Sequence, residues 1–479
     1  MPSAQQAILR YFRLVLGVFF RRIEVTGDDT VPRDRGVLAV SWHPNGIIDG
    51  GVVLSYFPRG IIVGARSGLF KWPILGWILR QLSAVPIYRR QDVKQDGSQS
   101  DRQNANRQAI DALAQAIADG GCSALFPEGT SHDEPHLHEI KTGAAYLYYR
   151  AVELTAAGSP PPVIVPVGLH YSDKTLFGSQ LLVAIHPPLE LPQGLVLPSP
   201  DPEEKKTQAR LLTAEFDRVL AEVVMATESW DLHHLMHRAR KLLRAEGAAR
   251  AGTRSAAPSI VERVRHFGTI WKRYQEATKK YPEETKRLLR GIARYDNLLS
   301  ALRIEDYELD GKAWVASPRR AVWLGLEFLL VYLVLPPFLV IGVVVNLIPA
   351  LIVWGFNRVV ARHYKDEATL KILVGSVLFP AAWLLAACLV GWGEGLLADI
   401  FPKIPRAPVV TGIIAFVLSA FGGMLALQYR QIATETYRTL RVQFTLARRK
   451  KAIATLLEWR RRLFDDFMAL ESKLADPGN

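Results

Sequence analysis

The residues best suited to chemistry in this sequence are a histidine and an aspartate that follow one apolar segment. His43 comes after the apolar run 36–41, a Pro-Asn-Gly break follows at 44–46, and Asp49 returns about one helical turn later. A carboxylate beside an imidazole fixes the ring's tautomer and stabilises its charged form, so the outer nitrogen can take a proton from a hydroxyl. The pattern predicts a general base. The alternative is a turn histidine followed by a helix-capping aspartate.

A second stretch reads Phe-Pro-Glu-Gly-Thr-Ser-His-Asp over residues 126–133. It follows an apolar run that begins at Cys122 and is predicted to be a strand. Where such a strand ends, the backbone amides around Gly129 are free to meet an anion.

Together with two further blocks, 84–92 and 164–171, these stretches resemble the glycerolipid acyltransferases, which esterify glycerol phosphates. The resemblance covers roughly residues 5–310. Five residues separate His43 from Asp49, one more than the superfamily usually has. This wider spacing and the form of block 126–133 look like the fungal-type glycerol-3-phosphate/dihydroxyacetone-phosphate acyltransferases, whose members also carry membrane spans after the catalytic domain.

The resemblance implies a general base and a phosphate site. His43, oriented by Asp49, would remove the proton of the acceptor hydroxyl. In the family, basic residues at the end of the third strand bind the substrate phosphate. Arg89 matches that place best, and Arg90 is the weaker candidate. A guanidinium suits the task because it meets phosphate oxygens with two parallel hydrogen bonds. A solvated arginine pair is the alternative interpretation.

Block 126–133 is expected to complete the glycerol phosphate site. Glu128 would orient Arg89 or hold a substrate hydroxyl, because a carboxylate cannot accept a hydrogen bond from a deprotonated phosphate. Gly129 would allow close backbone approach. Thr130 would either donate to the phosphate or cap the local turn, and Lys141 stands where the family has a lysine that can make a second phosphate contact.

No metal and no cofactor are expected. The histidines at 132, 136 and 138 lie in a predicted loop interrupted by Pro135, and the inferred chemistry requires no metal. The expected partners are an acyl-CoA or acyl carrier protein as acyl donor, glycerol 3-phosphate or lysophosphatidic acid as acceptor, and anionic membrane lipids, but no nucleic acid.

Apolar runs alternate with helical patterns over the first part of the chain. Strands are predicted at 22–26, 36–41, 61–65, 85–88, 123–126, 163–168 and 181–186, and helices at 5–23, 72–80, 106–119 and 143–154, with a polar loop at 91–104. The alternation predicts an α/β fold with a mixed, mainly parallel sheet flanked by helices, followed by a helical region and a C-terminal membrane-embedded helical segment. Ligands of such sheets bind at the carboxyl ends of the strands, where His43 is expected.

The composition divides the chain into five predicted segments. They are an interfacial helix and lead-in strand at 1–26, the acyltransferase catalytic domain at 27–198, a helical accessory region at 199–312, a membrane segment at 313–428, and a basic amphipathic helix at 429–479. This last helix would lie along anionic lipid or pack against the protein.

The membrane segment contains long apolar runs. Residues 321–356 carry one charge, Glu327, and are interrupted at Pro336-Pro337, whereas 372–393 and 407–427 are uncharged. A helix needs about 20 residues to cross the hydrocarbon core. Basic residues favour the cytoplasmic side both for the loop 358–371 and for 429–462, so we expect an even number of crossings: a hairpin over 321–356, then two spans. Three spans with an external basic tail are the alternative.

The bulk properties agree with a membrane enzyme. Lys and Arg exceed Asp and Glu by 59 to 46, and 49% of the residues are hydrophobic. The basic residues flank apolar runs, which favours lipid and phosphate over nucleic acid as the anionic partner. The two cysteines imply no disulfide framework, so the catalytic part is expected in the cytoplasm. The Ala/Arg-rich composition suggests a bacterial inner membrane, with the endoplasmic reticulum as the eukaryotic equivalent.

The resulting hypothesis is a membrane-bound O-acyltransferase acting on the sn-1 hydroxyl of glycerol 3-phosphate. Acylation of lysophosphatidic acid or another lysophospholipid is the alternative within the same class, because the same motifs serve both acceptors. A membrane lipid-binding scaffold with a degenerate site is the non-enzymatic alternative, and a thioesterase that turns over without an acceptor is a third.

Overall fold

The computed structural model describes residues 2–88, 99–253, 258–310, 318–360, 364–401, 403 and 405–475. Two compact units are formed: one by Met1–Trp230, Ser259–Val264 and Ala361–Ile372, and the other by Asp231–Pro258, Arg265–Val360 and Leu373–Asn479. Arg89 and Arg90, the expected phosphate ligands, lie outside the described residues.

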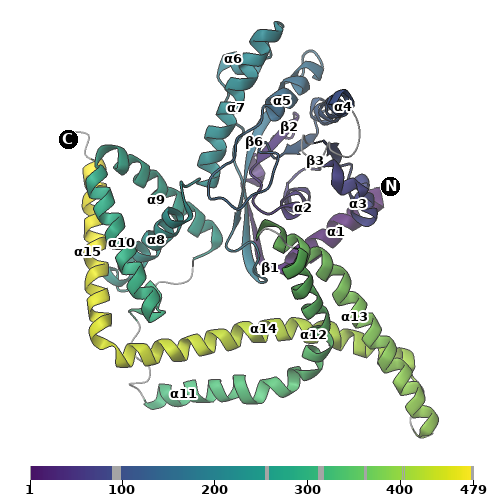
Figure 1. Cartoon of the computed structure of the whole chain (residues 1–479), viewed down its shortest axis with the longest axis vertical. Helices are drawn as coiled ribbons and strands as arrows, with labels where there is room; N and C mark the ends of the chain where they lie inside the picture. The colour runs from purple at the N-terminus through teal and green to yellow at the C-terminus, as the bar shows by residue number, and fades with distance from the viewer. Residues whose placement is uncertain are drawn as a thin grey trace. The chain divides into compact units, whose positions relative to one another are not determined.

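A seven-stranded sheet organises the first unit (Figure 1). Its strand order is β1-β7-β6-β2-β5-β3-β4. Neighbouring strands run parallel except β6 and β7, which are antiparallel, so the predicted mixed, mainly parallel sheet is confirmed. The strands are β1 Phe20–Thr26, β2 Val37–Ser41, β3 Ile61–Arg66, β4 Val85–Ile87, β5 Cys122–Leu125, β6 Val163–Tyr171 and β7 Ser179–Ile185.

Helices cover both faces of this sheet (Figure 1). They are α1 Pro2–Phe19, α2 Ile47–Tyr56, α3 Pro73–Gln81, α4 Gln99–Ala118, α5 Gly143–Leu154, α6 Gln193–Val196 and α7 Pro202–Val224, with short 3-10 helices at Asp28–Thr30 and Ser67–Lys71. Val37 and Ala39 of β2 belong to the apolar cluster under α1, α2 and α3, whereas Leu38 and Val40 face the cluster under α4, α5 and α7. Burial on both faces explains why the run before His43 is apolar throughout.

Two predicted boundaries are wrong by a few residues. The first helix was expected to continue to residue 23, but it ends at Phe19 and the chain enters β1 at Phe20, which is paired with β7 and buried. Strand pairing overrides the helical pattern there. The predicted loop 91–104 is also too long, because α4 already begins at Gln99.

The first described turns of the apolar helix α13 (Tyr364–Ile400) belong to the first unit. Ala368 and Ile372 are buried in the cluster that also holds Leu16 and Val52. The ammonium of Lys371 donates to the carbonyl of Thr175, at 3.2 Å. The core around the sheet therefore includes a piece of a candidate membrane helix.

The second unit is helical. It contains α10 Pro282–Leu302, a 3-10 turn at Asp306–Glu308, α11 Pro318–Leu329, a π-helical turn at Leu330–Val334, α12 Leu335–Val360, α14 Pro408–Arg448 and α15 Lys450–Ala475, together with most of α13. It also contains α8 Trp230–Arg250 from Asp231 onward and α9 Ile260–Lys280 from Arg265 onward. Within this unit, the buried Arg460 of α15 donates to Glu246 and Asp310 and to the carbonyl of Asp306. The C-terminal helix is thus packed against the accessory helices by a buried charge.

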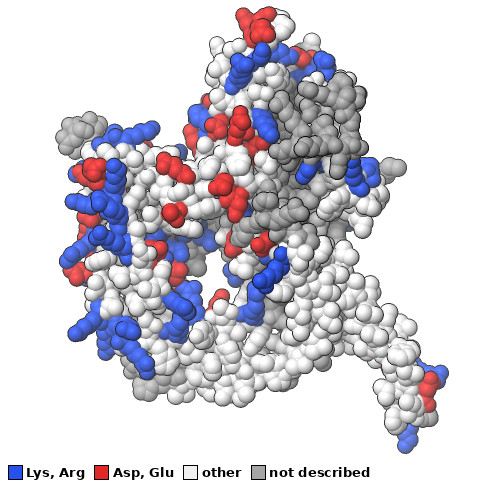
Figure 2. Space-filling view, in the orientation of Figure 1, with Lys and Arg blue, Asp and Glu red and all other residues white. Residues whose placement is uncertain are grey.

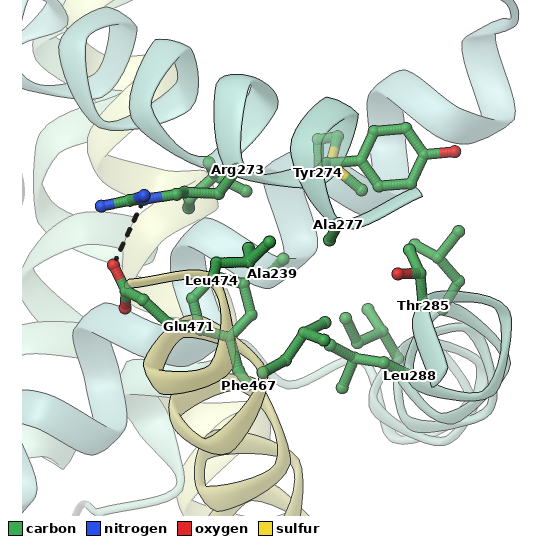
Figure 3. A pocket seen from close by; sticks show the side chains of 14 residues that line it. Ala239, Arg273, Tyr274, Ala277, Thr285, Leu288, Phe467, Glu471 and Leu474 are labelled. Carbon is green, nitrogen blue, oxygen red and sulfur yellow. Dashed lines mark ion pairs between the residues drawn. The ribbon is translucent and has the colours of Figure 1, made fainter. Parts of the chain in front are cut away.

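An apolar groove lies where α8, α9, α10 and α15 meet (Figure 3). Ala239, Leu288, Phe467 and other mostly apolar side chains line it. The ion pair between Arg273 and Glu471, at 3.5 Å, lies at one edge (Figure 3). This packing makes α15 an integral element of the second unit.

Among the residues that the structure describes, three helices are long and apolar enough to cross a membrane: Gly342–Val359, Glu367–Ile400 and Pro408–Arg448. Residues 372–393 of α13 include no charged residue, and the visible surface toward the far tip of the helix is largely white (Figure 2). Asn346 joins these helices, because its amide donates to the carbonyl of Ser419 at 2.9 Å and accepts from the indole of Trp383 at 2.9 Å.

Candidate active site

His43 and Asp49 meet at the carboxyl end of the central strand β2. The Nδ1 atom of His43 lies 2.9 Å from Oδ2 of Asp49 in the first turn of α2. Gly46 connects strand and helix with φ +54°, a left-handed conformation that favours glycine. The His43 side chain is 15% exposed and that of Asp49 is fully buried, so the ring is accessible while its carboxylate is shielded from water.

Both oxygens of Asp49 have protein donors. Oδ2 also accepts from the backbone amide of Asn45, at 2.6 Å, and Oδ1 accepts from the hydroxyl of Tyr171, at 2.6 Å. Burial and the neighbouring Asp49 carboxylate raise the pKa of Tyr171 well above its usual value, so the phenol remains a protonated donor. Three hydrogen bonds therefore converge on one buried carboxylate and fix its orientation.

The imidazole of His43 is fixed from a second side. It stacks on the ring of Phe126, with 4.3 Å between centroids and 17° between planes. The preceding Trp42 donates from its indole to the carbonyl of Leu169, at 3.0 Å. With Nδ1 engaged by Asp49, Nε2 is the nitrogen left to exchange a proton with a hydroxyl, as general base catalysis requires.

Both carboxylate oxygens of Glu128 accept hydrogen bonds from protein donors. Oε2 accepts from the backbone amide of His43 at 3.1 Å, and Oε1 accepts from Nε2 of His132 at 2.7 Å and the backbone amide of His138 at 3.0 Å. The side chain is fully buried. These contacts favour a bracing role for Glu128 over the expected contact with a substrate hydroxyl, and they join the second motif directly to the first.

Gly129 and Lys141 lie together beside this carboxylate. Gly129 has φ +67°, and a Cβ placed on it would lie 3.1 Å from the ammonium of Lys141. The backbone amide of Lys141 is held by the carbonyl of Pro127, at 2.9 Å. A positive charge thus rests against a glycine turn, as an anion site needs. Thr130 donates to the carbonyl of Ser131 at 3.4 Å, which fits the local turn role.

The three histidines of this loop do not converge on a metal site. His132 and His138 stack with 3.8 Å between ring centroids, and His132 Nδ1 accepts from the amide of Glu134 at 3.2 Å. Within the described ranges, no three His, Cys, Asp or Glu side chains are placed to hold a metal ion.

Sequence reasoning missed the residues that close the site from β6 and the turn after it. Tyr171 reaches Asp49, and the buried Lys174 donates to the carbonyl of Pro44 at 3.0 Å while pairing with Asp133. The side-chain amide of Asn45 donates to the backbone carbonyl of Lys174, at 3.3 Å. Tyr171 ends the fourth block of the resemblance, but it lies 122 residues from Asp49 and no spacing rule connects them.

Residues 22–170 match the family model named Acyltransferase. Glycerol-3-phosphate O-acyltransferase 1 of Saccharomyces cerevisiae is 25% identical over 60% of this chain and 35% of its own length. Glycerol-3-phosphate O-acyltransferase 2 of the same yeast is 33% identical over 18% of this chain and 11% of its own length. An uncharacterized acyltransferase of Schizosaccharomyces pombe is 21% identical over 75% of this chain and 53% of its own length.

Among solved structures, the 1-acyl-sn-glycerophosphate acyltransferase of Thermotoga maritima is 18% identical with a TM-score of 0.30, covering 45% of this chain and 79% of that chain. The chain spans only 35% of the first yeast relative.

The part of the chain that carries His43, Asp49 and Glu128 therefore matches an acyltransferase domain. The family match and the yeast relatives confirm the predicted resemblance to the glycerolipid acyltransferase superfamily.

Proposed function

We propose that this protein is a membrane-bound O-acyltransferase that moves a fatty acyl group from an acyl thioester to the sn-1 hydroxyl of glycerol 3-phosphate, making lysophosphatidic acid for phospholipid biosynthesis. The observation that carries the proposal is the hydrogen bond of 2.9 Å between His43 and the buried Asp49, inside the region that matches the acyltransferase family. The names of both yeast relatives specify glycerol 3-phosphate as their acceptor, which supports the same acceptor here.

His43 acts as the general base in this proposal. Nε2 takes the proton of the sn-1 hydroxyl as its oxygen attacks the thioester carbonyl, and Asp49 stabilises the imidazolium that forms. When the tetrahedral intermediate collapses, the C–S bond breaks and the imidazolium returns its proton to the thiolate. The new C–O bond remains in the product, and no acyl-enzyme is formed.

The glycerol phosphate is placed by a cationic site beside the base. Lys141 lies against the Gly129 turn, and Arg89 with the weaker candidate Arg90 would supply guanidinium groups from the end of β4. Thr130 serves the turn or the phosphate. Holding the hydroxyl at Nε2 converts a bimolecular encounter into an intramolecular one, which supplies much of the rate.

The acyl donor is an acyl-CoA or an acyl carrier protein, and the chain works at a membrane. Three long apolar helices support an integral membrane protein in contact with anionic lipids. The basic residues that flank these helices favour a cytoplasmic position for the acyltransferase domain, in a bacterial inner membrane or the endoplasmic reticulum.

The test is thiol release from palmitoyl-CoA by the detergent-purified protein. Reactions contain glycerol 3-phosphate, dihydroxyacetone phosphate, lysophosphatidic acid or no acceptor, and are repeated with acyl carrier protein donors. We expect release that depends on glycerol 3-phosphate and falls about 10²- to 10⁴-fold in His43→Ala. His266→Ala, which alters an exposed histidine of α9, is the matched control and should keep wild-type activity.

Other outcomes would overturn the proposal in distinct ways. Release only with lysophosphatidic acid assigns the next acylation. Release without any acceptor indicates a thioesterase. No release with any donor and acceptor, with lipid binding retained, indicates a lipid-binding scaffold.

A further inference from the structure

The hydroxyl of Tyr171 contacts the carboxylate of the His43–Asp49 pair. It ends β6, the neighbour of β2 in the sheet, and its hydroxyl donates to Oδ1 of Asp49 at 2.6 Å. The ring is held in place by the pairing of Tyr171 with Leu181 of β7 and by contact with Phe20, whose ring centroid lies 5.7 Å away. The position of the hydroxyl is therefore fixed by the strand pairing of β6 and by the packing of the ring.

We propose that Tyr171 is a positioning residue for the general base. By holding Oδ1 it orients the Asp49 carboxylate so that Oδ2 faces His43, and it moderates the negative charge that controls the proton affinity of His43. This inference rests on the proposed acyltransferase function.

Geometry limits Asp49 to one productive orientation. Oδ2 receives two donors, His43 Nδ1 and the amide of Asn45, both from the turn between β2 and α2. Oδ1 receives its donor from a different strand, so Tyr171 is what ties the carboxylate to the sheet. Without that hydroxyl, a buried charged oxygen loses its partner, which is costly in an interior that excludes water.

Other charged groups also surround the pair. Glu128 accepts from the backbone amide of His43, and His132 donates from its backbone amide to the carbonyl of His43. Lys174, paired with Asp133, donates to the carbonyl of Pro44. All of these groups remain when only the phenolic oxygen is removed, so Tyr171→Phe removes only the contacts of that oxygen with Asp49 and with the side chain of Asn45.

The sign of the effect follows from electrostatics. Removing a donor leaves more uncompensated negative charge on Asp49, which favours a positive charge on the neighbouring ring. The acid limb of the kcat/KM profile should therefore move to higher pH. A less firmly oriented ring should also lower kcat about tenfold, with the KM for the acceptor unchanged.

The experiment compares the full-length wild-type protein with Tyr171→Phe and the control Tyr149→Phe. Tyr149 is fully buried, and its hydroxyl has no hydrogen-bond partner among the described residues, so its removal should not move the profile. One readout is the pH dependence of kcat/KM. The second needs no substrate: the pH dependence of diethylpyrocarbonate modification of His43, measured by mass spectrometry of the His43 peptide.

The two readouts separate failure of the inference from failure of the proposed function. If no acceptor supports turnover, the modification profile still tests whether Tyr171→Phe moves the pH dependence of His43 modification to higher pH. An unchanged profile in Tyr171→Phe overturns the inference, as does an equal shift in Tyr149→Phe.

Incorporation of 3-fluorotyrosine at position 171 covers the case in which Tyr171→Phe fails to fold. Its more acidic hydroxyl is a stronger donor and should shift the profile in the opposite direction, to lower pH. An unchanged profile in this variant also counts against the inference.

Discussion

At the scale of residues, Glu128 is the link between the two motifs. Its buried carboxylate accepts from the backbone of His43 on one oxygen and from His132 and His138 on the other. An ionised carboxylate accepts hydrogen bonds on both of its oxygens and donates none. The amide of a glutamine, which has the same size, accepts on its oxygen but donates from its nitrogen. The acid at this position therefore has a structural reason that is independent of any substrate.

We predict that Glu128→Gln lowers both stability and kcat. The side-chain NH2 group of the glutamine would face a hydrogen-bond donor, the backbone amide of His43 or the donors from His132 and His138. This mismatch should lower the free energy of unfolding by about 1–3 kcal/mol. The KM for the acceptor should hardly change, because the side chain is fully buried. Denaturant unfolding and steady-state kinetics measure these effects, with the exposed Glu139→Gln as control. A large rise in acceptor KM at unchanged stability would instead indicate direct substrate contact.

At the scale of elements, α8 carries two histidines that resist protonation. Burial, together with nearby positive charge, lowers the pKa of His237 to about 2 and that of His233 to about 4. Their Nε2 atoms lie 3.2 Å apart, and both rings contact Phe267 of α9. The charged neighbours of His237 include Arg240 and Lys241, so the packing of α8 on α9 favours neutral rings.

We predict that the second unit loses stability in mild acid. In the unfolded chain a histidine takes up its proton near pH 6.5, whereas these two stay neutral in the fold. The unfolded state then binds more protons, so the free energy of unfolding falls as the pH drops below about 6.5. Each histidine contributes at most about 1.4 kcal/mol per pH unit.

Thermal unfolding at pH 7.5 and at pH 5 checks this acid sensitivity. His237→Gln, which cannot be protonated, should reduce the fall in Tm, whereas His266→Gln, at an exposed position, should not. Equal falls in all three proteins would refute the assignment.

At the scale of the whole molecule, the two compact units constrain how the chain can cross a membrane. Residues 361–372 belong to the unit of the sheet, so they lie on its side of the membrane. On α14 and α15, Arg438 and Arg460 pair with Glu308 and Glu246 of the accessory helices. No apolar run separates α7 from α8 in the chain. We infer an even number of crossings before residue 361 and again between residues 372 and 438.

We therefore predict that α13 and α14 cross and return, while the segment containing α11 and α12 returns to its own side. Cysteines added one at a time to a Cys388→Ser background, which keeps the buried Cys122, test this topology when probed with a membrane-impermeant maleimide. Arg358→Cys at the end of α12 should be labelled from the same side as Lys279→Cys in α9, and Arg406→Cys from the opposite side. Labelling of Arg358→Cys from the side opposite to Lys279→Cys would support three spans.

Local features were readable in the sequence because they depend on neighbours in the chain. The apolar strand before His43, the glycine turn and the helix that returns Asp49 lie within a dozen residues, and their spacing alone brings the pair together. The glycine turn after β5 is equally local. Burial of β2 on both faces marks it as a central strand of a mainly parallel sheet, so the fold class was also predictable.

Tertiary structure decided which distant segments complete the site. Tyr171 reaches Asp49 because β6 lies beside β2, and Lys371 reaches Thr175 because α13 packs on the domain of the sheet. Strand order and helix docking arise from the summed burial of many side chains, which no motif spacing encodes. The sequence by itself therefore determined the proposed base and its carboxylate, whereas the hydroxyl that contacts Asp49 became visible only in the folded chain.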